Sequence, residues 1–107
     1  MARQETHAAS IEQDGNRLLI KGELDFHSVP ALARQAAALL ARMQDASVDC
    51  AGVSRANSAG LALLLEMSRI MRARQRAIAF HNVPPQIQSV AHAYGLAEPE
   101  QKLEAIL

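Results

Sequence analysis

The alternation of strand-like and helix-like segments is the feature that most limits how this chain can fold. Short apolar runs of the kind found in strands occupy residues 8–13, 17–24, 47–50 and 77–82. Longer segments with apolar residues at helical spacing occupy residues 28–44, 58–75 and 84–96. The order strand, strand, helix, strand, helix, strand, helix predicts an α/β sandwich with a mixed, mostly parallel sheet of four or five strands covered by helices.

Turn and capping residues mark the ends of several segments. The sequence "DGN" at residues 14–16 is typical of a hairpin turn between the first two strands. Ser28 is placed to cap the first helix, with Pro30 in its first turn, and Gly95 marks the end of the third helix. Residues 51–56 are predicted to form a loop after the third strand, and the tail at 98–107 is predicted to be a short strand or a turn of helix.

Helical spacing also predicts which residues face the core. In the first helix the apolar face comprises Val29, Leu32, Ala36, Leu39, Leu40 and Met43. In the second helix it comprises Leu61, Leu64, Leu65, Ser68 and Met71. Since 107 residues suffice for one core but not two, we expect a single domain over residues 1–107 with its core at about 8–96.

Composition and charge exclude several classes of protein. The net charge is zero and aromatic residues make up 3% of the chain, so the arginines at 69, 72, 74 and 76 are better explained by a helix carboxyl end than by nucleic acid. Cys50 is the only cysteine and the four histidines lack ligand spacing, so no metal or other cofactor is expected. No apolar run is long enough to span a bilayer, and we expect a cytoplasmic protein.

The stretch "SRANSAG" at residues 54–60 is the strongest candidate for a functional site. It resembles the G-x-S-x-G turn of hydrolases, with Ser58 as the nucleophile. However, no aspartate follows Asp49, and Glu66 lies on the same predicted helix as Ser58, so a catalytic triad is not supported. The sequence therefore argues against a serine hydrolase that uses Ser58, which is the weakest of the hypotheses considered for this site.

Ser58 is better explained as a capping residue, a contact or a modification site at the start of the second helix. Asn57 can provide the cap, which leaves the hydroxyl of Ser58 facing outward. Ala59 and Gly60 remove bulk from the first turn, so a partner surface is expected to approach closely there. Nearby, Glu23 and Asp25 resemble a pair of catalytic carboxylates, but capping or loop orientation is the more ordinary role for them.

Three segments together resemble one known family. They are "IKGELDFHSVPALA", "VDCAGVSRANSAGLALLLEMSR" and "AFHNVPPQIQSVAHAYGL", and they are similar to the signature segments of STAS domains, the fold of the anti-sigma factor antagonists. The resemblance covers about residues 11–96. Within that family, "GVSR", the hydroxyl residue before "GLALLL" and the closing "AYGL" are most similar to the MlaB-like branch, the small subunits of phospholipid-transport ABC complexes.

The resemblance implies a function without catalysis. An MlaB-like protein docks on the cytoplasmic, MlaF-like ATPase subunit, and through it on the permease, at the inner membrane, where it supports a transporter that maintains outer-membrane lipid asymmetry. By this resemblance the partner contacts are Arg55, Asn57, Ser58 and Gly60, with Leu63 and neighbouring exposed residues of the second helix around them. No nucleic acid and no direct membrane insertion is implied.

The wider family implies a second hypothesis. In anti-sigma factor antagonists a partner kinase phosphorylates the serine of a D-S-x-G loop, and that serine aligns with Ser58. Here Asn57 replaces the usual aspartate and Ala59 a common second serine. The phosphorylation of Ser58 by an anti-sigma factor kinase is therefore the alternative, and docking on the ATPase is the first hypothesis.

Overall fold

The structure, a computed structural model, describes residues 8–98 and 100–107, and in these residues four strands form one sheet. The sheet has the order β1-β2-β3-β4, with bounds β1 Ser10–Asp14, β2 Arg17–Leu24, β3 Asp45–Ala56 and β4 Ala77–His81. β1 and β2 form an antiparallel hairpin, whereas β2 with β3 and β3 with β4 run parallel. The predicted mixed, mostly parallel sheet is confirmed, and it has four strands.

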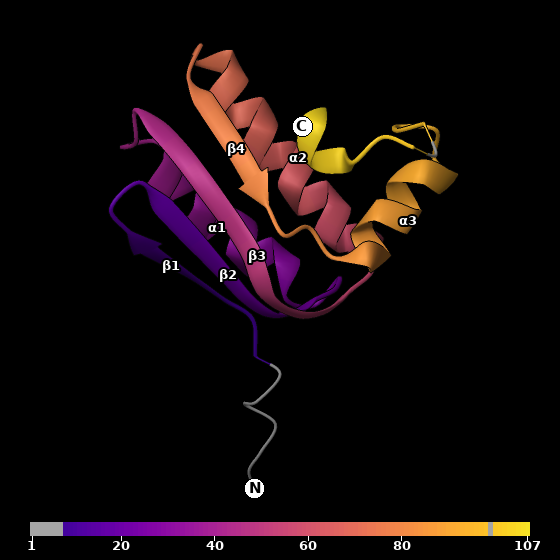
Figure 1. Cartoon of the computed structure of the whole chain (residues 1–107). Helices are drawn as coiled ribbons and strands as arrows, with labels where there is room; N and C mark the ends of the chain where they lie inside the picture. Colours follow the sequence, from indigo (N-terminus) through magenta and orange to yellow (C-terminus); the bar gives the residue numbers. More distant parts are fainter. Residues whose placement is uncertain (1–7, 99) are drawn as a thin grey trace, which may run out of the picture.

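Three α-helices and a 3₁₀ turn complete the described chain: α1 Val29–Leu40, α2 Ser58–Ala73, α3 Pro85–Ala93 and η2 Leu103–Ala105. α1 and α2 each connect neighbouring parallel strands. Because such crossovers are right-handed and the strand order advances in one direction, both helices fall on the same face of the sheet. Figure 1 shows them together on one side of the strands.

Burial along the strands agrees with this two-layer arrangement. On β2, Leu18, Ile20 and Leu24 are at most 1% exposed, whereas Arg17 and Lys21, at alternate positions, face solvent. Cys50 on β3 lies on the buried face as well, and burial raises the pKa of its thiol to about 12. Among the described residues, one face of the sheet therefore carries α1, α2 and the core, and the other face carries neither of these helices.

α1 follows the predicted pattern but ends earlier than the sequence suggested. Four residues of its predicted face are buried, namely Leu32, Ala36, Leu40 and Met43, and Val29 and Leu39 pack against them partly buried. The helix ends at Leu40, not at residue 44. The carbonyl of Leu40, the last residue of α1, accepts a hydrogen bond from Arg74, and the carbonyl of Met43, three residues after the helix, accepts one from Arg76.

β3 differs most from the sequence prediction. Residues 51–56 were expected to form a loop, but they continue the strand to Ala56. They pair with β2 up to Leu24↔Ala56, with irregular register on the way. β4 pairs with β3 only as far as Asp49↔His81. The extension is thus held on one side only, which explains why its residues lack the apolar character of a central strand.

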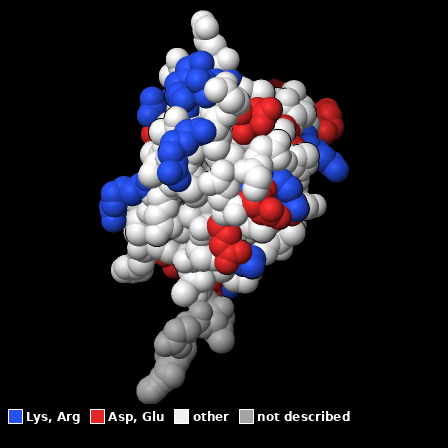
Figure 2. Space-filling model, turned by 90° about the vertical axis from the view of Figure 1, so that its left-hand side faces the viewer, with Lys and Arg blue, Asp and Glu red and all other residues white. Residues whose placement is uncertain are grey.

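The arginines near the end of α2 take part mainly in internal contacts. Arg74 and Arg76 donate to carbonyl groups at and just after the end of α1. Arg69 forms a bidentate ion pair with Glu66, and Arg72 donates to the carbonyl of Ile106. Figure 2 shows positive residues toward one end of a face that also carries acidic groups. The explanation by helix carboxyl ends is supported for Arg72, in the last turn of α2, and for Arg74, which binds the last residue of α1, whereas Arg76 binds the segment that follows α1.

The tail follows the second of its two predicted alternatives. Leu103 to Ala105 form a 3₁₀ turn, and Leu103 is 1% exposed. Across residues 8–98 and 100–107, no helix has the length and apolar character to cross a bilayer. The same residues contain no group of three or more His, Cys, Asp or Glu side chains arranged around a metal position.

Candidate functional site

The candidate site lies where the carboxyl ends of β2 and β3 meet the start of α2. The two strand ends lie side by side, with Leu24 paired to Ala56. The backbone N–H of Asn57 then donates to the carbonyl of Leu24 at 3.1 Å, which fixes the entry of α2 to the sheet. In open α/β sheets this edge is the usual place for ligand and partner contacts.

Asn57 caps α2 with its side chain. Its backbone is extended, and its Oδ1 accepts a hydrogen bond from the N–H of Ala59 at 2.8 Å. Its own carbonyl accepts from the N–H of Gly60 at 2.9 Å. Two donors of the first turn are therefore already satisfied within the chain, and a partner does not need to supply their acceptors.

Ser58 is the first residue of α2 and is half-buried. In the part of the chain that the structure describes, its Oγ makes no hydrogen bond to a histidine, a carboxylate or any other group. A serine nucleophile needs a base within hydrogen-bond reach. The geometry instead leaves a hydroxyl group available to another molecule.

Gly60 and Leu63 lie inside the fold, which corrects two expectations. Leu63 is 1% exposed and belongs to the core, so it cannot lie at the edge of a contact surface. A Cβ on Gly60 would lie 3.1 Å from Ile87 Cδ1 and 3.2 Å from Ala56 Cβ. The missing side chain therefore gives room to α3 and β3 of the same chain, and not to a partner.

The reason for these corrections is the position of α2 between its neighbours. α2 contacts α1 and α3 as well as the sheet, and its buried residues are Ala59, Gly60, Leu61, Leu63, Leu64, Met67, Ser68 and Met71. Leu65, predicted to face the core, is instead 40% exposed. Residues four and seven positions after Ser58 share its side of the helix, whereas a residue five positions later does not.

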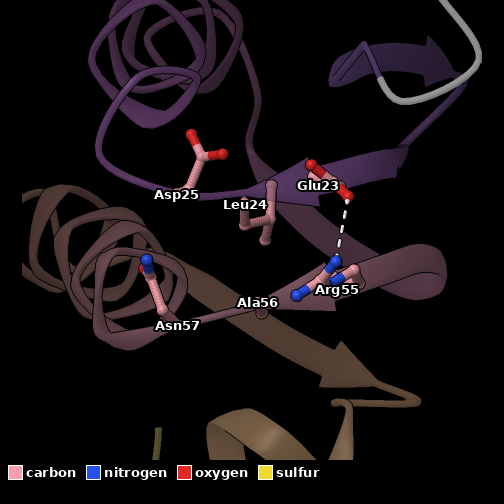
Figure 3. A pocket seen from close by; sticks show the side chains of 6 residues that line it. All are labelled: Glu23, Leu24, Asp25, Arg55, Ala56 and Asn57. Atoms are coloured by element: carbon pink, nitrogen blue, oxygen red, sulfur yellow. Dashed lines mark ion pairs between the residues drawn. The ribbon is translucent and has the colours of Figure 1, made fainter. Parts of the chain in front are cut away.

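A polar pocket of about 270 Å³ opens beside the start of α2 and is lined by Glu23, Leu24, Asp25, Arg55, Ala56 and Asn57. Figure 3 shows Asp25 and Asn57 on either side of it, with Glu23 and Arg55 at the strand ends. Arg55 and Asn57, both predicted contacts, thus share one pocket. Ser58 follows Asn57 directly but does not line it.

The charged groups of the pocket differ in the strength of their contacts with the rest of the chain. Arg55 Nη1 lies 3.9 Å from Glu23 Oε2, and the Arg55 side chain is 79% exposed, so this ion pair is weak. Asp25 Oδ1 accepts from the N–H groups of Ser28 and His27, both at 2.9 Å. These backbone hydrogen bonds lower the pKa of Asp25, which is therefore ionised at neutral pH.

The loop-orienting role expected for one of the two acids belongs to Asp25. Ser28 precedes α1 but makes no side-chain cap; its Oγ donates to the carbonyl of Glu23 at 2.7 Å and accepts from the N–H of Asp25 at 3.0 Å. The sequence analysis did not single out Phe26, which follows the pocket residue Asp25 in the chain and whose side chain is 69% exposed. The signal in the sequence that could have singled out Phe26 was its position between a strand end and a helix start, in a chain with only three aromatic residues.

Comparison with protein families identifies the chain. A family model described as "Mlab, STAS domain" matches residues 7–105, nearly the whole sequence. The chain belongs to this STAS family. The resemblance seen in the sequence is thereby confirmed at the level of the family. A comparison with curated proteins found no match.

Solved structures show the same fold. The anti-sigma factor antagonist SpoIIAA in its unphosphorylated form has a TM-score of 0.65 and 22% identity over 83% of this chain and 82% of its own. The phosphorylated form of Bacillus SpoIIAA has a TM-score of 0.64 and 21% identity over 94% and 100%. An anti-sigma factor antagonist from Mycobacterium paratuberculosis has a TM-score of 0.66 and 19% identity over 90% and 84%.

Proposed function

We propose that this STAS domain is a non-enzymatic accessory subunit that docks on the cytoplasmic ATPase of an ABC-type phospholipid transporter. The observation that carries the proposal is the group formed by Arg55, Asn57 and Ser58, which is presented to solvent while the start of α2 is fixed to β2. The Mlab description of the matching family favours a transporter partner. The domain would then lie in the cytoplasm, bound to the inner membrane through the ATPase and the permease.

The free face of α2 extends this surface. Ala62, Leu65 and Arg69 follow Ser58 at intervals of four, three and four residues, and all three are exposed. Their spacing places them on one side of the helix in line with Ser58. Ala62 and Leu65 therefore replace Leu63 as the outer members of the proposed contact.

The absence of a catalytic role is part of the proposal. Among the described residues Ser58 Oγ makes no hydrogen bond to a base or an acid, and the pocket's ionised Asp25 accepts hydrogen bonds from backbone N–H groups. A rigid surface with a free hydroxyl suits recognition by another protein. The expected effect of the domain is on the assembly and activity of the ATPase.

Co-purification with the ATPase subunit tests the proposal. Ser58→Arg and Ser58→Glu each place a long charged side chain at the centre of the surface, and both are expected to abolish co-purification. Ala62→Arg, one turn further along the same face, is expected to weaken it strongly. Ser58 is half-buried and Ala62 is exposed, so the melting temperature of all three variants should change little.

Ala38→Arg is the matched control, since Ala38 is an exposed alanine on α1. It is expected to leave co-purification unchanged. Retention of the ATPase by both Ser58 variants would show that the proposed surface is wrong. A loss of folding in these variants, measured by circular dichroism, would also contradict the position of Ser58 at the surface.

A phosphorylation switch is the second candidate function. It is favoured by the free hydroxyl of Ser58 at the amino end of a helix, where the helix dipole stabilises a phosphate. Two of the structural neighbours are described as phosphorylated and unphosphorylated forms of an anti-sigma factor antagonist. Intact mass after incubation with an anti-sigma factor kinase and ATP tests it: a phosphate absent from Ser58→Ala supports the switch, and no added mass contradicts it.

A further inference from the structure

The tail of the chain returns to the fold and forms one side of a groove along α2. Leu103 is 1% exposed and belongs to the core, and Ile106 and Leu107 pack against the core partly buried. Figure 1 shows the yellow end of the chain beside α2. The groove has a volume of about 470 Å³, and its lining includes Leu65, Arg69, Arg72 and Ala73 of α2 together with Ile106 and Leu107 of the tail.

This groove continues the surface that is proposed above to contact the ATPase. Leu65 and Arg69 line it, and both also follow Ser58 on one side of α2. Leu65 is 40% exposed, whereas the other three leucines of α2 are at most 2% exposed. The exposed side of α2 and the tail therefore belong to one surface.

The two arginines of the groove already make hydrogen bonds within the chain. Arg69 binds Glu66 in a bidentate pair, and Arg72 donates to the carbonyl of Ile106 at 3.3 Å. What the groove offers a partner in addition is apolar area on both of its sides, from Leu65 on α2 and from Ile106 and Leu107 on the tail. An apolar side chain is the group that gains most by entering it.

A clamp of three hydrogen bonds holds the tail from the side of α3. Gln88 Nε2 donates to Glu104 Oε1 at 2.6 Å, and Gln88 Oε1 accepts from the N–H of Leu103 at 2.8 Å. The other carboxylate oxygen, Glu104 Oε2, accepts from the N–H of Val83 at 3.1 Å. The clamp thus ties η2 to α3 and to the connection between β4 and α3.

The clamp requires a particular set of donors and acceptors. The N–H groups of Leu103 and Val83 are fixed donors at its two ends, so the two side chains between them must supply three acceptors and one donor. One amide and one carboxylate meet this requirement, whereas two amides leave two donors facing each other. Exchanging the two side chains, by Gln88→Glu together with Glu104→Gln, keeps all three hydrogen bonds and reverses only the central one.

We propose that Ile106 and Leu107 form the second wall of the docking surface, that Gln88 and Glu104 are the positioning residues of this wall, and that the groove receives an apolar side chain of the ATPase subunit. This inference rests on the proposed function, because it extends the same surface. Gln88 and Glu104 line a different depression and not the groove, so they act on the partner only through the tail. A wall that is already in place loses little conformational entropy on binding, so a loosened clamp lowers the affinity.

Titration calorimetry of the purified chain with the purified ATPase subunit tests the inference. Glu104→Gln is expected to raise Kd about fivefold, because two donors then face each other and the tail leaves its position more often. Gln88→Glu combined with Glu104→Gln is expected to return Kd to within about twofold of the wild-type value. Amide hydrogen exchange of residues 100–107 should be faster in the single variant and slow again in the double variant.

Leu107→Asp changes the wall directly and is expected to raise Kd about tenfold or more. Leu96→Asp is the matched control, since Leu96 is a 45% exposed leucine just after α3 that does not line the groove. It is expected to change Kd by less than about twofold. Circular dichroism should show that all these variants fold.

The possible outcomes separate this inference from the proposed function. A wild-type chain that does not bind the ATPase would contradict the proposed function and this inference with it. Wild-type binding with an unchanged Kd for Leu107→Asp or for Glu104→Gln would overturn the inference alone. A Kd that stays raised in the double variant would show that Gln88 and Glu104 do not act through the clamp, and would overturn their role as positioning residues.

Discussion

Replacing Gly60 with alanine tests whether this glycine serves the fold or a partner. The new Cβ would lie 3.1 Å from Ile87 Cδ1, 3.2 Å from Ala56 Cβ and 3.3 Å from Leu24 Cβ. All three distances are shorter than ordinary carbon contacts of about 3.5–4.0 Å. Leu24 and Ala56 are paired residues of β2 and β3, so their Cβ atoms cannot retreat unless the sheet moves.

Two effects of opposite sign set the magnitude. Alanine is favoured over glycine inside a helix by about 1 kcal/mol, which would stabilise the variant. Overpacking of a close-packed core costs about 1–3 kcal/mol. Only Ile87 Cδ1, the end of a side chain, can move easily, so we expect overpacking to prevail and Gly60→Ala to lower the free energy of unfolding by about 1 kcal/mol.

Urea denaturation followed by circular dichroism measures this change. A second measurement in the Ile87→Val background, which lacks the Cδ1 atom, should show a smaller cost of Gly60→Ala, because one of the three close contacts is gone. If Gly60 instead made room for a partner, Gly60→Ala would raise the free energy of unfolding and weaken docking. A rise in stability would therefore refute the packing explanation.

Substitutions of two leucines of α2 compare a buried with an exposed side chain. Leu63→Ala, in the core, is expected to lower the free energy of unfolding by about 2–5 kcal/mol in urea denaturation, whereas Leu65→Ala, on the exposed face of α2, should lower it by less than about 1 kcal/mol. Equal losses of stability in the two variants would contradict the burial of Leu63. Hydrogen bonds from Asn82 and from the N–H of Ala51, together with Arg17, lower the pKa of Asp49. Its stabilising contribution is thus present above the ordinary aspartate pKa near 3.9 and is lost as the pH falls through the lower native value. Asp49→Asn should therefore be less stable than the wild type at pH 7, and urea midpoints that differ by the same amount at pH 7 and pH 2 would contradict this role.

Turn and capping residues in the sequence correctly predicted those element ends that depend only on residues close by in the chain. The hairpin turn forms as expected, since Gly15 has a positive φ of 64° between β1 and β2. Gly95, with φ of 75°, ends α3 in the same way. The start of α2 at Ser58 and its cap by Asn57 were also predictable, because the capping side chain needs only residues two positions away.

Features that depend on distant parts of the chain were not predictable in this way. The strand at residues 51–56 exists because β2 lies beside it, and its own residues carry no strand pattern. The burial of Leu63 follows from the contacts of α2 with both α1 and α3, which widen the buried side beyond a single apolar stripe. The exposure of Phe26 depends likewise on the course of the connection between β2 and α1.

The residues that the sequence assigned to the docking surface fall into two groups, one whose substitution should affect stability and one whose substitution should affect binding. Gly60 and Leu63 support the position of α2 from inside, so their substitution should change stability first and binding only through it. Arg55 and Ser58 are exposed or half-buried, so their substitution should change binding and leave stability nearly unaltered. Because the N–H of Asn57 binds the carbonyl of Leu24, the exposed group keeps its position as long as the sheet and α2 remain folded. Loss of binding without loss of stability is therefore the property that defines a true contact residue at this site.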